Sequence, residues 1–130
     1  MRRFATNILV RNNRLLMMEN NGLRVNYDIL SDKDYIIELK HKLLEETQEV
    51  IDAKSTQELK EEIIDVMEVL EHIIDFYGFD KGELNQLKEQ KQEKYGKFDK
   101  KIKINYVEMD DNHEEIAYYL SKPNKYPEMK

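Results

Sequence analysis

Two groups of acidic residues lie on two consecutive amphipathic segments of this chain. The first is Glu45-Glu46-Thr47-Gln48-Glu49 and the second is Glu62-Ile63-Ile64-Asp65. Acids three residues apart lie on one side of a helix, where their like charges destabilise it by about 0.2–0.5 kcal/mol per pair. Carboxylate oxygens are the ligands that hard cations such as Mg²⁺ prefer. The spacing therefore indicates a site in which carboxylates from two helices hold a divalent cation.

The place of these acids on their helices distinguishes them from ordinary surface charge. The chain has 27 acidic residues in 130, so pairs at this spacing also arise by chance on a solvated face. Glu46 and Glu49, however, border the apolar stripe of the first helix, and Glu62 and Asp65 border that of the second. The four acids can therefore meet when the stripes pack. Glu45 is rotated away from Glu46 around the helix, so it is a candidate only for a supporting role at the site.

Capping signals place the two groups on an antiparallel helical hairpin. Ser31-Asp32 predicts the start of a helix that runs to about Ala53. Ser55, with Glu58 three residues further on, has the spacing of a capping box and predicts a second helix that stops at Gly78. Because only a tight turn around residues 54–56 separates these helices, they must run in opposite directions.

The flanking segments predict shorter elements. A short helix should end near residues 20–22, and a third long helix should run from about residue 80 to Tyr95. Alternating apolar residues in 23–29 and 102–106 predict two short strands that could pair as a ribbon. A last helix is expected over 112–120. We expect one domain over residues 1–120, followed by an extended or disordered tail over residues 121–130.

Composition limits the class of protein. The expected fold class is mainly all-α. Because a lone hairpin buries one face poorly, we expect a second copy to complete a four-helix-bundle-like core. The net charge is −6, which argues against a nucleic-acid polymer as partner. There is no cysteine, and no apolar run approaches the roughly 18 residues of a membrane span. We expect a cytoplasmic protein that does not enter a membrane.

Several segments, in order, resemble one enzyme family. Lys42 to Glu49, followed after a short turn by Glu61 to Val66, is similar to the EExxE and ExxD motifs of the MazG-type all-α nucleoside triphosphate pyrophosphohydrolases. Asn7-Ile8-Leu9-Val10-Arg11 resembles the NKLVRDK opening of a small single-domain branch, described as house-cleaning or phosphoribosyl-ATP pyrophosphohydrolase-like. Lys94-Tyr95-Gly96-Lys97-Phe98 resembles the (K/R)-GGF closing segment of that branch. The resemblance covers roughly residues 7–108.

The resemblance implies a cofactor and a set of site residues. The cofactor is Mg²⁺, with Mn²⁺ as the other candidate, and the implied ligands, which also form the catalytic group, are Glu46, Glu49, Glu62 and Asp65. The implied contacts to substrate phosphates are Arg11, Lys94 and Lys97. The family's dimers and tetramers also imply a homodimer or homotetramer.

The chain departs from the family pattern in both flanking segments. Asn12 and Asn13 replace an acid and a base of the opening motif, and Lys97 replaces a glycine of the closing one. Because these segments would contact the substrate, its identity stays open. Tyr27 is a candidate for base stacking, although a core role is commoner for such a tyrosine. His72, seven residues after Asp65 on the same helix face, is a candidate for contact with that acid.

The implied reaction is hydrolysis of the α–β phosphoanhydride of a nucleotide, which gives a monophosphate and pyrophosphate. The metal would lower the pKa of a bound water, and Glu49 or Glu45 would orient that water. Two alternatives stay open. The substrate could be phosphoribosyl-ATP, or the chain could be a non-catalytic helical dimer that a cation stabilises and that binds another protein.

Overall fold

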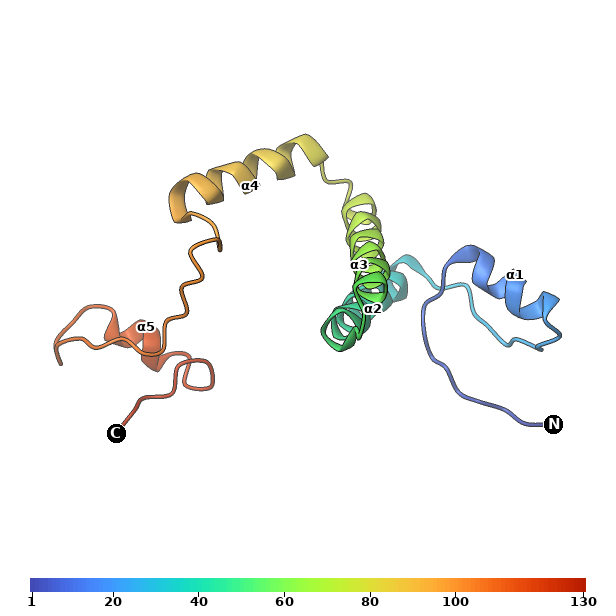
Figure 1. Cartoon of the computed structure of the whole chain (residues 1–130), viewed down its shortest axis with the longest axis horizontal. Helices are drawn as coiled ribbons and strands as arrows, with labels where there is room; N and C mark the ends of the chain where they lie inside the picture. The colour runs from blue at the N-terminus through green and yellow to red at the C-terminus, as the bar shows by residue number, and fades with distance from the viewer. The chain divides into compact units, whose positions relative to one another are not determined.

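Two long helices, α2 (Asp32–Asp52) and α3 (Thr56–Tyr77), form an antiparallel hairpin in the computed structural model, which describes residues 1–130. They are the one pair of helices in extensive contact, and Figure 1 shows them side by side. The three remaining helices are α1 (Asn12–Asn20), α4 (Lys81–Tyr95) and α5 (Ile116–Leu120). The prediction of a mainly helical chain is confirmed.

The ends of the hairpin helices follow the predicted capping chemistry. The Ser31 hydroxyl accepts a hydrogen bond from the amide of Asp34, at 3.3 Å, and the Ser55 hydroxyl accepts one from Glu58, at 3.1 Å. These bonds satisfy amide groups that have no partner within the helix. Gly78 ends α3 with φ at +66°, a left-handed conformation that a side chain would disfavour.

The hairpin has a very small apolar core. Leu39 on α2 and Val69 on α3 are its only buried apolar side chains, and the one other buried residue is Glu46. Ile36, Leu43 and Val66 along the same seam are half-buried. A single hairpin therefore removes little apolar surface from water, which limits the stability that it can supply by itself.

The chain divides into two compact units, Met1–Gln90 and Lys91–Lys130, and each is described by itself. The first contains α1, α2 and α3. The second contains α5, where Tyr118 and Tyr119 each pack against Tyr126 with ring centroids 6.0 and 5.2 Å apart. The predicted boundary of a single domain at residue 120 stays a prediction.

The predicted β ribbon is wrong, because the structure contains no strand. Residues 23–29 and 102–106 alternate in polarity as predicted, but neither forms a backbone ladder with another segment. Alternation places apolar groups on one side of an extended chain, whereas a strand also needs a partner for its amide and carbonyl groups.

The last helix is also shorter than predicted, since α5 begins at Ile116 and turns precede it. No helix combines the length and the apolar character needed to cross a membrane.

Candidate metal centre and adjoining pocket

Three of the four predicted metal ligands meet between the hairpin helices. Glu46 from α2 and Glu62 and Asp65 from α3 each offer one carboxylate oxygen, and these oxygens lie within 4.8 Å of one another. We call these three residues the acidic cluster. Glu46 is buried, whereas Glu62 and Asp65 are half-buried. Glu49, the fourth predicted ligand, is exposed and is not part of this cluster.

The donor set of the acidic cluster fits a small, hard cation. All three donors are carboxylate oxygens, which Mg²⁺ and Mn²⁺ prefer. Oxygens that share an octahedral Mg²⁺ at about 2.0–2.1 Å lie at most roughly 4.2 Å apart. Oxygens at neighbouring positions lie closer still, roughly 2.9 Å apart, so the three side chains would have to move inward to hold the ion. Because three residues leave coordination positions open, water or phosphate oxygens could complete the shell.

Glu62 is the member of the acidic cluster that has no cationic partner. Partial burial, followed by the negative charges of Glu49, Asp65 and Glu46, raises the pKa of its carboxyl group. No lysine, arginine or histidine lies within ion-pair distance of it. The ionised form of Glu62 is therefore disfavoured in the folded chain, and an added cation would relieve this.

A Glu62→Gln variant should melt at a higher temperature than the unchanged chain at pH 7 without divalent cations. A raised folded-state pKa means that ionisation of Glu62 destabilises the fold as pH rises above the ordinary pKa of glutamate. The difference in melting temperature should shrink as the pH falls towards 4, because the Glu62 carboxyl then becomes increasingly protonated and neutral, like glutamine. Thermal unfolding followed by circular dichroism at both pH values measures this. Glu61→Gln, next to the cluster, is the control; an equal rise in both variants would contradict the prediction.

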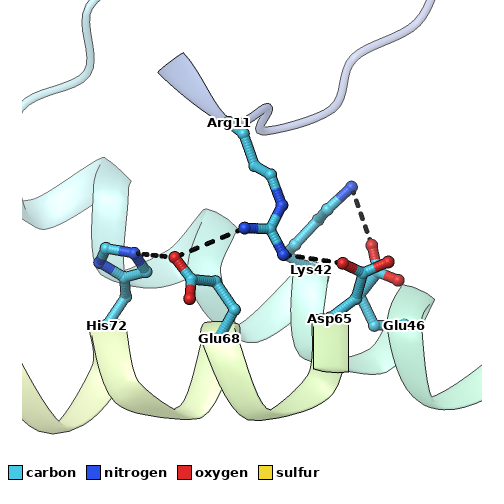
Figure 2. Close-up of polar contacts among 6 residues, drawn as sticks. All are labelled: Arg11, Lys42, Glu46, Asp65, Glu68 and His72. Carbon is cyan, nitrogen blue, oxygen red and sulfur yellow. Dashed lines mark hydrogen bonds and ion pairs between the residues drawn. The ribbon is translucent and has the colours of Figure 1, made fainter. Parts of the chain in front are cut away.

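Two basic side chains compensate the other two acids, as Figure 2 shows. Lys42 Nζ lies 3.3 Å from Glu46 Oε1 and 3.2 Å from Glu45 Oε1. Arg11 Nη2 donates a hydrogen bond of 2.7 Å to Asp65 Oδ1. This bond, together with the nearby carboxylates, raises the pKa of Arg11 above its usual value. The cluster is therefore partly neutralised from within the chain.

Arg11 also reaches a second acid outside the cluster. Its Nη1 lies 3.6 Å from Glu68 Oε1, and the same oxygen lies 3.1 Å from His72 Nε2. Figure 2 shows the guanidinium between Asp65 and Glu68, with His72 beyond Glu68. A contact between His72 and Asp65 was the prediction, but the partner of His72 is Glu68, four residues before it on α3, and His72 makes no ion pair with Asp65.

A pocket adjoins the acidic cluster. Its volume, about 480 Å³, is typical of small-ligand sites. It lies between the segment that leads into α1 and the α2–α3 hairpin. One part of its lining is apolar or aromatic and includes Leu9, Val10, Tyr35, Leu39 and Val69. The other part carries amides and charges: Arg11, Asn12, Asn13, Lys42, Glu46, Asp65, Glu68 and His72. Such a lining offers an apolar surface beside groups that can bind an anion and a cation.

The predicted substrate contacts fall in different parts of the chain. Arg11 lines the pocket. Lys94 and Lys97 belong to the second unit, Lys91–Lys130, so their role as phosphate ligands stays a prediction. Lys94 lies in the last turn of α4, with its ammonium 5.1 Å from the centre of the Tyr95 ring. Tyr27 is exposed and is not part of the pocket lining, where the aromatic residue is Tyr35.

Two residues of this site, Lys42 and Glu68, were not predicted from the sequence. Lys42 precedes Glu46 by four residues, a spacing that predicts an ion pair on a helix. Glu68 follows Asp65 by three residues and precedes His72 by four, so it shares their helix face. Both spacings were therefore present in the sequence, although neither distinguishes a site residue from an ordinary surface pair.

Comparison of the chain with protein-family models, with curated proteins and with solved structures finds no match.

Proposed function

We propose that the chain is a Mg²⁺-dependent nucleotide pyrophosphohydrolase. The observation that carries this proposal is the meeting of Glu46, Glu62 and Asp65 beside a pocket that also contains Arg11 and Lys42. A cation held by carboxylates, with basic side chains close by, suits a substrate that contains phosphate. The resemblance of residues 7–108 to MazG-type pyrophosphohydrolases supports the same reaction class.

The residues of the site would have distinct roles. Glu46, Glu62 and Asp65 would hold Mg²⁺, which when bound neutralises phosphate charge and lowers the pKa of a coordinated water. Lys42 holds the buried Glu46 carboxylate in place. Arg11 would bind phosphate oxygens with its planar guanidinium. Glu49 or Glu45, both outside the acidic cluster, would orient the attacking water.

In the proposed reaction the water oxygen forms a bond to the α-phosphorus, and the bond from that phosphorus to the α–β bridging oxygen breaks. The bridging oxygen leaves with pyrophosphate, and the water proton passes to a base. The products are a nucleoside monophosphate and pyrophosphate. Most of the rate enhancement would come from positioning and from electrostatic stabilisation of the phosphates.

We propose that two copies of the chain pack through the hairpin face opposite the site. Ile37, Leu44 and Ile51 on α2 are 44%, 73% and 70% exposed. At 3.6 residues per turn they lie about 140–180° around the helix from Glu46. Ile63, Met67 and Leu70 on α3 are also exposed and lie roughly opposite Asp65. Covering this face with a second hairpin would form a four-helix bundle and bury apolar surface that the small core of one hairpin leaves exposed.

One observation favours a second candidate function, a non-catalytic helical binding module. Arg11 and Lys42 already pair with two of the three clustered acids, so the cluster can be compensated without a metal. In that case the internal ion pairs would stabilise the hairpin. Its pocket or its exposed apolar face would bind another protein.

An assay of pyrophosphate release separates the two candidates. The purified chain is incubated with standard, deoxy and modified nucleoside triphosphates and with phosphoribosyl-ATP, in Mg²⁺ or in chelator. We expect turnover of at least one substrate in Mg²⁺ and none in chelator, because the acids need the cation to bind phosphate. No turnover of any substrate, together with no Mg²⁺-linked rise in melting temperature, would support the binding module instead.

A further inference from the structure

Arg11 bonds two acids that have different surroundings. Asp65 belongs to the acidic cluster and accepts the 2.7 Å hydrogen bond from Nη2. Glu68 lies outside the cluster, 3.6 Å from Nη1, and its other neighbour is His72. The guanidinium thus spans the cluster and a neighbouring carboxylate, and Figure 2 shows both contacts.

The contact between Arg11 and Asp65 competes with metal binding. A divalent cation in the cluster would bind the same Asp65 carboxylate that accepts from Arg11, and the two positive charges would repel each other across that carboxylate. The Arg11 side chain is 57% exposed and comes from the extended segment before α1, so the helix packing does not hold it in place. Arg11 can therefore leave Asp65 without disturbing the hairpin.

Glu68 is the acid that can hold Arg11 after this move. It follows Asp65 by one helical turn, so both carboxylates lie within reach of one arginine side chain. His72 lies on the side of Glu68 away from Arg11 and limits the positions of the carboxylate. A guanidinium paired with Glu68 alone would keep N–H groups free at the edge of the pocket that its side chain lines.

We propose that Arg11 exchanges Asp65 for Glu68 when a divalent cation binds, and that Glu68 positions Arg11 for the phosphates of the substrate. This inference rests on the proposed function for the identity of cation and substrate. Without metal, Arg11 neutralises Asp65 and occupies one of its two oxygens. With metal, Arg11 is held one turn further along α3, where it contacts phosphate. Arg11 thus opposes metal binding and favours substrate binding.

Calorimetric titration of Mg²⁺ without nucleotide tests the exchange. Arg11→Met should bind Mg²⁺ about fivefold more tightly than the unchanged chain, because an exposed ion pair of about 1 kcal/mol no longer competes. Arg14→Met is the matched control: it removes the same charge from α1, where the Arg14 side chain has no acidic partner, and should change the affinity less than twofold. Arg11→Lys keeps the positive charge but lacks the planar guanidinium, so its Mg²⁺ affinity should lie between those of Arg11→Met and the unchanged chain.

The same variants show whether Glu68 positions Arg11. Glu68→Gln should weaken Mg²⁺ binding, because Arg11 then stays on Asp65, and this effect should be smaller in the Arg11→Met background. In steady-state assays both Arg11→Met and Glu68→Gln should raise the KM for nucleotide. Tighter metal binding combined with weaker substrate binding in Arg11→Met is a pair of opposite effects that loss of structure would not produce.

The outcomes distinguish this inference from the proposed function. If Arg11→Met and the unchanged chain bind Mg²⁺ with equal affinity, and the unchanged chain releases pyrophosphate, the exchange is overturned and the proposed function stands. Tighter binding in Arg11→Met without turnover of any triphosphate would support the exchange and contradict the reaction. If neither chain binds Mg²⁺, both proposals are overturned.

Discussion

Glu46→Gln should lower Mg²⁺-dependent pyrophosphate release by about a hundredfold or more. Changes to residues that only support metal ligands already cost about 10–100-fold, so loss of a ligand should cost at least as much. Glutamine has nearly the same volume as glutamate, and Lys42 keeps its second partner, Glu45, at 3.2 Å. The helix content should therefore stay unchanged. The measurement is initial-rate pyrophosphate release, with circular dichroism as the check on folding.

The control for this variant is Glu61→Gln, which removes the same charge from α3 outside the acidic cluster. It should keep its activity, because Glu61 is exposed and its partner is Gln57 on the same helix. Mg²⁺ should also raise the melting temperature of the control but not that of Glu46→Gln. Full activity in Glu46→Gln would remove Glu46 from the metal site and overturn the proposed centre.

Leu44→Glu combined with Ile51→Glu should convert a dimer into monomers. Full burial of a leucine or isoleucine side chain contributes about 1.5–3 kcal/mol, so losing two per chain should raise the dimer dissociation constant at least about a hundredfold. Both side chains are more than two-thirds exposed in one chain, so the substitutions themselves spare its small core. Sedimentation equilibrium of the unchanged chain should give twice the 15.7 kDa of one chain.

A matched control adds the same two charges elsewhere. Gln86→Glu with Gln90→Glu changes exposed positions of α4 and should leave the dimer intact. The monomeric variant should also melt at a lower temperature, because Leu39 and Val69 are the only buried apolar side chains of the isolated hairpin. A monomeric mass for the unchanged chain would contradict the four-helix bundle.

The hairpin and the acidic cluster could be predicted because their signals are local. Ser31, Ser55 and Gly78 mark helix ends through bonds and backbone angles that involve only nearby residues. Once two helices are joined by a short turn, acids at the borders of their apolar stripes lie along one seam and can approach each other. Three of the four predicted acids do so.

The remaining features depend on contacts between distant residues. Arg11 and Asp65 are 54 residues apart, and nothing in their local sequence pairs them. The alternating segments around residues 25 and 104 show the opposite error, because a local pattern was read as a strand although no partner strand exists. The use of Glu68 as a second acid for Arg11 likewise follows from tertiary structure alone.

The short connection between α2 and α3 has a consequence for how the site forms. Glu46 and Glu62 are only sixteen residues apart in the chain, so closing the loop between them carries a small entropy cost. Contacts of such short range form early when a chain folds. The carboxylates of the acidic cluster can therefore come together as the hairpin forms, before residues 1–11 reach them. On this order of events a divalent cation would meet Asp65 before Arg11 does, and the nascent hairpin could acquire its metal without competition.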